Sequence, residues 1–365
     1  MIKFLDLYHQ YRTIQPEVDA AIQKTIETAA FIGGRSVRIF EDAFARYQQA
    51  DHCVGVANGT DALEIAIEAL GLPEGSEVIV PANSFISSSE AVTRSGHKVV
   101  FADVDPETYT IDLADLERRI TALTRAVVAV HLYGHPCDMS GLLGIAKRHN
   151  LKLVEDCAQA HGAEYRGRRV GALGDIGTFS FYPGKNLGAY GDAGAILTNN
   201  AELAMKCRMI ANHGRVEKYN HIIEGRNSRL DGLQAAILNV KLTHLDGWIE
   251  RRNAIAKRYM LGFNDIGGLT LPTVRGGARH AFHLFVVRLA ERNSLKTHLD
   301  QSGIESGIHY PIALPKLAAY SYLNQAREPM RANAMDAEVL SLPMGEHLTN
   351  AEVDTVIDAV KAFFS

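Results

Sequence analysis

Short apolar runs alternate with amphipathic stretches through the first half of the chain. The runs are rich in valine and other β-formers, and we predict buried strands at 78–80, 99–104, 126–133 and 152–156. Between them, apolar residues recur at helical spacing over 61–72 and 139–150. Strands that alternate with helices of this length indicate βαβ units and a mainly parallel sheet. Such sheets bind ligands outside the carboxyl ends of their strands.

The second half of the chain carries a different pattern. A helical pattern continues from Arg229 to Phe263, and we interpret it as a long helix that connects two domains. Beyond it we predict a strand, a helix and a terminal helix at 283–290, at 294–302 and from residue 350 onward. The whole pattern predicts an α/β fold, with a large domain over 1–245 that includes the N-terminal segment and a smaller α+β domain over 246–365.

Length and charge exclude several classes of protein. At ~150 residues per domain, 365 residues favour two or more domains with a substantial core. The 38 Lys and Arg residues against 42 Asp and Glu residues give a net charge of −4, which argues against a nucleic-acid partner. A hydrophobic content of 47% excludes a mainly disordered chain.

The N-terminus and the cysteines predict a cytoplasmic protein. Asp6 interrupts the apolar residues at the N-terminus, so we expect no signal peptide. The chain has no run of 18 apolar residues, so we expect no membrane span. The four cysteines form no C-x-x-C pair, and a chain of this length needs no disulfide framework.

The first candidate site is ANGTDAL (57–63), where an apolar strand ends and a helix begins at once. The free N–H groups and partial positive charge of a helix N-terminus attract phosphate. Gly59 lets the backbone approach an anion closely, and Thr60 can cap the helix or donate to the anion. The motif is equally typical of an ordinary capped helix after a strand, so alone it leaves both interpretations open.

Two further candidates are Asp156, at the end of a predicted strand, and Lys185, in a glycine-rich loop. Glu155 and Asp156 are adjacent, so they face opposite sides of the strand. The loop is not a P-loop because Asn186 stands where Ser or Thr is required, and GAYGDAG lacks the spacing of a dinucleotide-binding loop. A lysine on a tight, uncluttered backbone suits a covalent bond to a cofactor. Taken singly, the two residues also fit a solvated strand end and a surface hairpin.

The motif HLYGHPC (131–137) brings His131, His135 and Cys137 together. The spacing is not a zinc signature, and no second cluster of ligands accompanies it. We therefore expect no metal, and we interpret the motif as a loop between a strand and a helix.

The first three candidates together match the needs of pyridoxal phosphate. The aldehyde needs a lysine amine, the phosphate needs a helix N-terminus, and the pyridine nitrogen needs a carboxylate to stay protonated. The sequence supplies all three, with Lys185 placed 29 residues after Asp156. A charge-assisted hydrogen bond of the kind that Asp156 would make contributes roughly 1.5–3 kcal/mol.

Five ordered motifs resemble those of the DegT-type nucleotide-sugar aminotransferases, which are fold type I pyridoxal phosphate enzymes of the aspartate aminotransferase superfamily. The motifs are ANGTDAL, VEDCAQAHGA, FSFYPGKNLGAYGDAGA, NHGR and GRNSRLDGLQAAIL. The similarity extends from FLDL at 4–7 to SLPM at 341–344. The resemblance implies a mainly parallel mixed sheet flanked by helices in the large domain, and a homodimer whose active sites are shared between subunits.

The resemblance also implies roles for the matching residues. Lys185 matches the lysine that bonds to the cofactor and later moves a proton, and Asp156 matches the carboxylate on the pyridine nitrogen. Gln159 matches the group that faces the phenolic oxygen. Phe85 matches the aromatic residue that stacks on the ring, with core packing as its alternative. The phosphate contacts that it implies are Gly59, Thr60, Ser180 and, from the neighbouring subunit, Asn227.

The lysine loop refines the expected substrate. Members that aminate C4 of the sugar typically carry a loop like HPxKxxTTGEGG, whereas YPGKNLGAYGDAGA resembles the group acting on 3-keto sugars. The implied reaction moves an amino group from L-glutamate to a dTDP-3-keto-6-deoxyhexose, for deoxyamino sugars of O-antigen lipopolysaccharide, S-layers or antibiotics. UDP-linked 3-keto-uronates and 4-keto sugars are the alternatives. Candidate substrate contacts, all of residue types that are often structural, are Tyr182, Arg215, Tyr219, Arg229, His309 and Tyr310.

Two other functions compete with this one. Sugar dehydratases of the same fold carry His where Lys185 stands, so the lysine argues against a dehydratase. A non-catalytic cofactor-binding regulator would need an added DNA-binding or partner module, and we find no basic helix-turn-helix segment in the chain.

Overall fold

The structure, a computed structural model, describes all residues from 1 to 365. Its largest element is a seven-stranded sheet with the order β1-β9-β8-β5-β4-β2-β3. Only β9 runs against its neighbours β1 and β8, while the remaining pairs are parallel. The strands are β1 His52–Val56, β2 Glu77–Pro81, β3 Lys98–Ala102, β4 Thr124–Val130, β5 Lys152–Asp156, β8 Ile176–Ser180 and β9 Gly194–Thr198.

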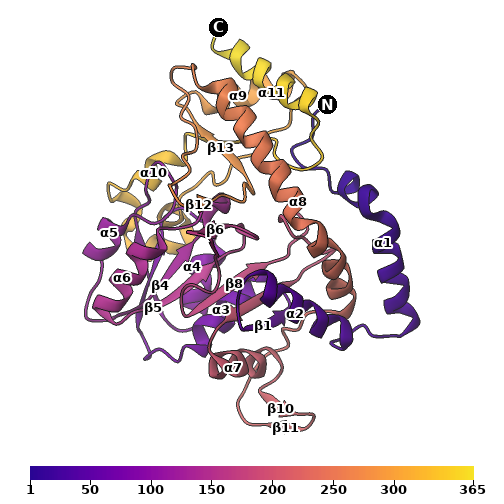
Figure 1. Cartoon of the computed structure of the whole chain (residues 1–365). Coiled ribbons are helices and arrows are strands. Elements are labelled where there is room, and N and C mark those ends of the chain that lie inside the picture. Colours follow the sequence, from indigo (N-terminus) through magenta and orange to yellow (C-terminus); the bar gives the residue numbers. More distant parts are fainter.

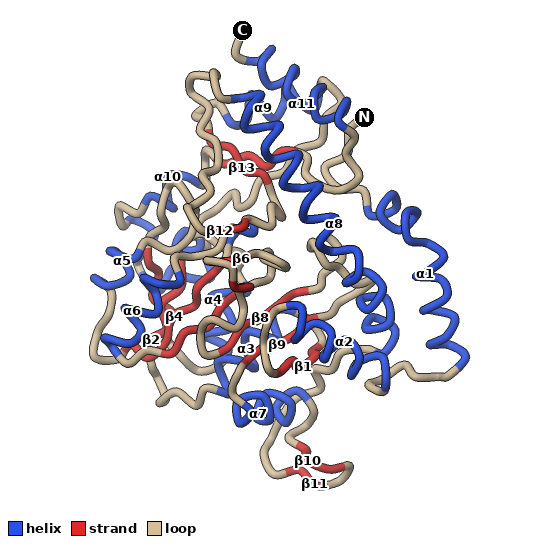
Figure 2. The backbone as a smooth tube through the Cα atoms, viewed as in Figure 1, coloured by secondary structure: helices blue, strands red, loops and turns tan.

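Helices cover both faces of this sheet (Figures 1 and 2). Apolar residues of one group of helices share a core with one face of the sheet: α1 Leu7–Glu27, α2 Arg35–Tyr47, α5 Leu113–Arg118, α6 Met139–His149 and the first half of α8 Gly232–Phe263. A second core lies on the opposite face, under α3 Gly59–Ala69, α4 Ser87–Arg94 and α7 Ala201–Ala211. The expected mainly parallel sheet flanked by helices is confirmed.

The smaller C-terminal part has a core of its own. The antiparallel strands β13 (Phe285–Arg288) and β14 (Val339–Leu342) pack with α9 (Arg292–Gln301), α11 (Asn350–Phe363) and the end of α8. Figure 1 shows α8 running from the large sheet into this part, with both chain termini beside it.

Two segments pack on the part of the fold that their position in the sequence does not predict. Ile2 belongs to the C-terminal core, whereas buried residues between 313 and 335 pack on the large sheet. The division at residues 245 and 246 therefore stays a prediction. The short elements are η1 Leu132–Gly134, β6 Glu164–Tyr165, β7 Arg168–Arg169, β10 Arg215–Glu217, β11 Asn220–His221, β12 Ala278–Arg279, η2 Leu314–Lys316, η3 Ala318–Leu323, η4 Gln325–Arg327 and α10 Arg331–Met335.

The sequence located the elements better than their ends. Predicted strand 126–133 stops at Val130 because His131 starts a tight turn, in which Tyr133 adopts a left-handed φ of 59°. The predicted long helix starts at Gly232, after the N-cap Asp231, instead of at Arg229. Helices α1 and α2 were not predicted.

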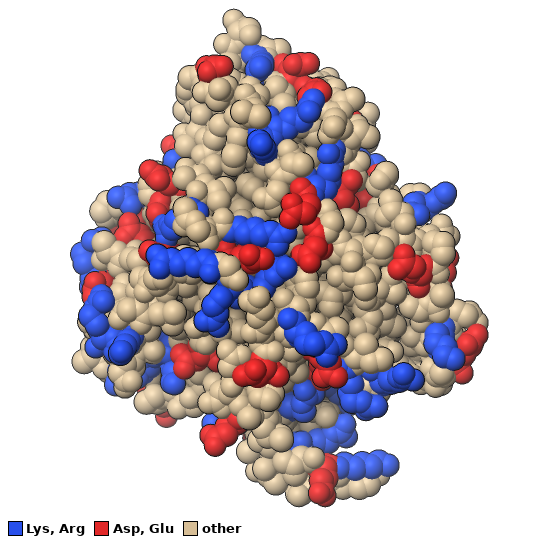
Figure 3. All heavy atoms as spheres, in the orientation of Figure 1, with Lys and Arg blue, Asp and Glu red and all other residues tan.

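Lys and Arg alternate with Asp and Glu over the face seen in Figure 3. None of the helices combines the length and the apolar character needed to cross a membrane.

The two carboxylates that end β5 point to opposite faces, as predicted, and Glu155 is fully buried. Its oxygens accept hydrogen bonds from the backbone N–H groups of Gly171, Leu173 and Gly174 and from Nε2 of His131. Cys157 lies close to this pair, but burial raises the pKa of its thiol to about 12, which keeps it protonated. Because the carboxylate is saturated by N–H donors, we assign it a structural role and propose no metal there.

The variant Glu155→Gln is expected to lower the free energy of unfolding by about 3 kcal/mol. The amide replaces one acceptor oxygen by an NH₂ group, which leaves buried N–H donors without acceptors. Urea unfolding of both proteins measures the difference. A loss below about 1 kcal/mol, the value of one ordinary hydrogen bond, would contradict the structural role of Glu155.

Candidate active site

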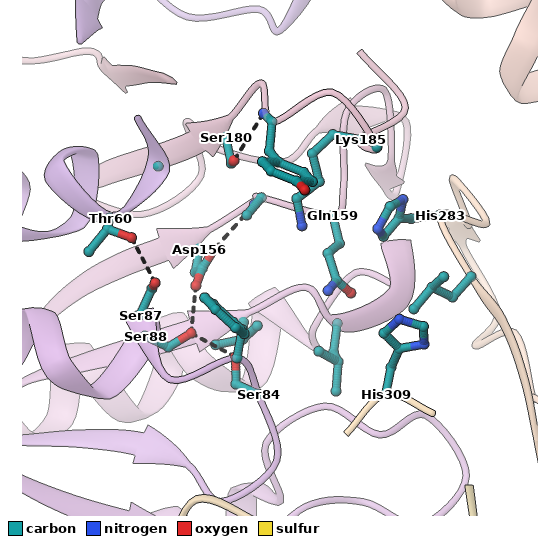
Figure 4. Close-up of a pocket in the computed structure, with 18 of the residues that line it drawn as sticks. Thr60, Ser84, Ser87, Ser88, Asp156, Gln159, Ser180, Lys185, His283 and His309 are labelled. Atoms are coloured by element: carbon teal, nitrogen blue, oxygen red, sulfur yellow. Dashed lines mark hydrogen bonds between the residues drawn. The ribbon is translucent and has the colours of Figure 1, made fainter. Parts of the chain in front are cut away.

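A cavity of about 870 Å³ opens at the carboxyl ends of the parallel strands, between the large sheet and the C-terminal part. Asp156 ends β5 there, and the loop that carries Lys185 joins β8 to β9. Figure 4 shows the side chains that converge on this cavity. The cavity wall includes ten of the residues singled out from the sequence: Gly59, Thr60, Phe85, Asp156, Gln159, Ser180, Tyr182, Lys185, His309 and Tyr310.

Four predicted residues lie outside the cavity of their own chain. Asn227 and Arg229 line a neighbouring hollow, which shares Asp192 with the main cavity. Arg215 and Tyr219 belong to the β10–β11 hairpin, which projects beyond α7 in Figure 1. Within one chain these four side chains do not meet Lys185, so their roles remain predictions that require a second subunit.

The N-terminus of α3 forms one wall of the cavity. Its N-cap Asn58 accepts a hydrogen bond from the N–H of Asp61 at 2.8 Å, which leaves the first amides of the helix free. A Cβ on Gly59 would lie 2.5 Å from Cβ of Ser180, so only glycine fits this close approach of helix and strand. Thr60 hydrogen-bonds Ser87 at 2.7 Å, and Ser87 begins α4. Hydroxyls and helix amides thus surround one end of the cavity, where an anionic phosphate fits.

Asp156 is held in place by two donors. Ser88 Oγ donates to one carboxylate oxygen at 2.7 Å, and the N–H of Ala158 donates to the other at 3.1 Å. Ser84 bonds Ser88 in turn at 2.6 Å, as the dashed lines in Figure 4 show. Ser88 was not predicted from the sequence, although a run of three serines follows the loop that contains Phe85. These contacts orient a carboxylate that is only 5% exposed toward the cavity.

Lys185 stands on a tightly folded loop. Its N–H donates to the carbonyl of Tyr182 at 2.8 Å, and a Cβ on Gly188 would lie 2.3 Å from the carbonyl oxygen of Pro183. Lys241 of α8, which is not part of the cavity wall, donates to the carbonyl of Gly188 at 2.5 Å and so anchors the loop. Burial lowers the pKa of Lys185 to about 8, and the opposing charge of Asp156 limits the shift. The loop thus supplies an amine that loses its proton near neutral pH.

The cofactor-free protein is expected to capture the aldehyde of pyridoxal phosphate faster as pH rises through about 8. Only the neutral amine of Lys185 can attack the aldehyde, and the lowered pKa sets the point at which that amine forms. The growth of visible absorbance after mixing, followed between pH 6.5 and 10, measures this rate. A midpoint near 10.5, the ordinary lysine value, would refute the assignment.

Phe85 and Gln159 supply an aromatic and an amide side chain to the cavity wall. Gln159 accepts from the N–H of Tyr133 at 2.6 Å and donates to the hydroxyl of Tyr310 at 2.9 Å. Phe85 lies 5.9 Å from the ring of Tyr310 and is 55% exposed, so one of its faces is available to a flat ligand. This exposure argues against the alternative that Phe85 is an ordinary core residue.

His283 is a further cavity residue that the sequence analysis did not single out. Its Nδ1 lies 3.2 Å from the amide oxygen of Asn186, whose NH₂ group donates to the carbonyl of Ala281. Because the amide oxygen can only accept, Nδ1 carries the proton and Nε2 is left as an acceptor. Burial lowers the pKa of His283 well below its usual range, which keeps the ring neutral.

The residues present fit pyridoxal phosphate at each of its polar groups. The α3 N-terminus with Thr60 and Ser180 suits the phosphate, Asp156 suits the pyridine nitrogen, and Lys185 suits the aldehyde. The fold and this cavity define a pyridoxal-phosphate-dependent enzyme. The chain belongs to the DegT/DnrJ/EryC1/StrS aminotransferase family, whose model matches residues 12–361.

Similar proteins agree with this assignment. The chain is 46% identical, over 363 residues, to the dTDP-3-amino-3,6-dideoxy-alpha-D-galactopyranose transaminase of Aneurinibacillus thermoaerophilus, and the match covers 100% of this chain and 99% of that protein. The crystal structure of S. venezuelae DesV in complex with a ketimine intermediate matches with a TM-score of 0.98 and 43% identity, covering 100% of this chain and 98% of that one. NtdA from Bacillus subtilis, solved with bound PMP, matches with a TM-score of 0.93 and 31% identity, covering 100% of this chain and 85% of that one. The protein is a pyridoxal-phosphate-dependent sugar aminotransferase.

Proposed function

We propose that this chain moves the amino group of L-glutamate to C3 of a dTDP-linked 3-keto-6-deoxyhexose, as a step in deoxyamino sugar biosynthesis. The observation that carries the proposal is Lys185 beside Asp156 in a deep cavity, in a chain similar over its full length to a dTDP-3-amino sugar transaminase. The lysine loop, YPGKNLGAYGDAGA, supports amination at C3 over C4.

Four cavity side chains have a part in this reaction: Lys185, Asp156, His309 and Tyr310. When bound, pyridoxal phosphate supplies the electron sink. Lys185, freed from the cofactor, takes the α-proton of the donor and later returns a proton to C3 of the sugar, as a general base with a pKa of about 8 can do near neutral pH. Asp156 holds the proton on the pyridine nitrogen, since Ser88 and Ala158 fix its two oxygens. His309 and Tyr310 lie where they can bind sugar hydroxyls.

We also propose a homodimer in the cytoplasm. Asn227 and Arg229 line a hollow that adjoins the active cavity, which fits their use across a subunit boundary. Large apolar side chains stay exposed on the same side of a single chain, among them Phe31 at 45% and Ile32 at 58%, and Ile32 lines that hollow. All four cysteines are free and buried, which suits a reducing compartment.

A panel of keto sugars tests the substrate. The enzyme, loaded with pyridoxal phosphate and L-glutamate, is expected to aminate dTDP-3-keto-6-deoxyhexoses at least about tenfold faster, in kcat/KM, than UDP-linked 3-keto-uronates, because binding differences of ~1–3 kcal/mol separate close analogues. Mass spectrometry of the aminated products gives the rates. Amination of 4-keto sugars alone would overturn the choice of C3, and a preference for the uronates would overturn the choice of sugar.

A further inference from the structure

The N-terminal segment reaches the active cavity, where Phe4 contacts Glu305 and His309, which lie more than 300 residues further along the chain. Phe4 and Leu5 both belong to the cavity wall, although α1 begins only at Leu7. Ile2 is paired with the C-terminal core by two backbone hydrogen bonds, from its N–H to Gly303 at 2.7 Å and from the N–H of Glu305 to its carbonyl at 2.9 Å. The segment is therefore fixed to the fold before it enters the cavity.

Further contacts place the two side chains. The N–H of Phe4 donates to the carboxylate of Glu305 at 2.9 Å, and its ring stacks on His309 at 5.7 Å. Leu5 packs on the lysine loop, with its Cδ2 3.4 Å from the Cβ position of Gly184, next to Lys185. The pair thus joins the lysine loop to the loop of His309 and presents an apolar surface in the wall of the cavity that also holds Lys185.

The part of the cavity wall that one chain supplies holds no cation free to accept a sugar carboxylate. Among the cavity residues, only Lys185 and Arg252 carry a formal positive charge. Arg252 is already used, because it donates to the carbonyls of His283 and Met344 and pairs with Glu346. Burial lowers the pKa of His309 to about 4, so this ring is neutral at pH 7.

Apolar side chains extend this surface. Leu284 and Met344 line the cavity as well, and they are 5% and 3% exposed. A sugar bound with C3 at the reacting position carries its C6 substituent within one ring of that point. A methyl group gains from burial on such a surface, a hydroxyl loses its hydrogen bonds to water, and a carboxylate loses still more.

We propose that Phe4 and Leu5 form the surface that receives C6 of the sugar, and that they select 6-deoxy sugars against sugars that bear a hydroxyl or a carboxylate at C6. This inference rests on the proposed function. It assigns a specificity-determining role to a segment that lies outside the cofactor site and takes no part in proton transfer.

The test compares two substrates that differ only at C6. We expect the wild type to prefer a dTDP-3-keto-6-deoxyhexose over its 6-hydroxy counterpart by about 10- to 100-fold in kcat/KM. Leu5→Ala and Phe4→Ala are expected to reduce this ratio to below about 3, mainly through slower use of the 6-deoxy sugar. Leu5→Gln, which offers the hydroxyl a partner, is expected to shift the ratio further toward the 6-hydroxy sugar.

A control and a fold check accompany these variants. Leu261→Ala, at a side chain that is 66% exposed and outside the cavity, is expected to keep the wild-type ratio. The melting temperature and the visible absorbance of bound cofactor report on folding independently of the sugar. A wild-type ratio in Leu5→Ala and Phe4→Ala, or equal use of both sugars by the wild type, would overturn this inference alone. A wild type that aminates neither sugar would overturn the proposed function and this inference with it.

Discussion

Lys185→Ala is expected to abolish the visible absorbance of the bound cofactor and to slow amino transfer by about four orders of magnitude. Lys185 is the only lysine in the cavity wall, so no other amine can bond to the cofactor or carry the proton. A positioned general acid–base group contributes roughly 10²–10⁴-fold, and loss of the covalent bond to the cofactor adds to this. Absorbance spectra of the loaded protein and single-turnover rates with L-glutamate measure both effects.

Lys241 provides a matched control for this variant. It is a second buried lysine whose pKa burial lowers to about 8, but it lies outside the cavity and donates to the carbonyl of Gly188. Lys241→Met is expected to lower the melting temperature and to keep the visible band. If Lys185→Ala kept the band and turned over, or if Lys241→Met alone lost the band, Lys185 would not be the cofactor lysine.

Asp156→Asn is expected to lower kcat by about 100-fold with little change in stability. An amide cannot hold a proton on the pyridine nitrogen as a carboxylate does, and a charge-assisted bond contributes roughly 1.5–3 kcal/mol, or about 10- to 160-fold in rate. The asparagine can keep the hydrogen bond from Ala158, so the fold of the β5 end survives. Steady-state kinetics and urea unfolding separate the two effects.

Glu155, the neighbouring carboxylate, provides a control for this prediction. Glu155→Gln is expected to act mainly on stability, because Glu155 accepts hydrogen bonds from buried N–H groups on the face of the sheet opposite Asp156. Asp156→Asn is also expected to move the pH midpoint of cofactor capture below about 8, because Asp156 raises the pKa of Lys185. If Asp156→Asn turned over normally and kept the pH midpoint of cofactor capture near 8, Asp156 would not be a catalytic residue.

Much of the site could be predicted because its groups follow strands in sequence. Asp156 ends β5, Gly59 starts a helix after β1, and Lys185 sits between β8 and β9, so the topology of a parallel sheet brings them to one edge. The predicted phosphate site at the N-terminus of α3 could be recognised in the sequence as a strand followed by a glycine and a helix cap. Its need for glycine became clear only from the contact between Gly59 and Ser180, which lie 121 residues apart in the sequence.

Other parts of the site could not be predicted, because no local sequence pattern marks them. In the sequence, Phe4 and Leu5 have the pattern of an ordinary apolar N-terminal segment. Only the pairing of Ile2 with the C-terminal core brings them to His309. The tautomer of His283 likewise depends on Asn186, a distant residue. Arg215, Tyr219, Asn227 and Arg229 lie outside the cavity of their own chain, so neither the sequence pattern nor one chain's structure places them at the site.

The most direct test of the account follows the nitrogen atom itself. The wild-type enzyme is incubated with ¹⁵N-labelled L-glutamate and a dTDP-3-keto-6-deoxyhexose, and the product is examined by NMR. We predict ¹⁵N bonded to C3 of the sugar, with one 2-oxoglutarate formed for each amino sugar, and loss of both products in Lys185→Ala. Label at C4, or a sugar product without label, would contradict the proposed function.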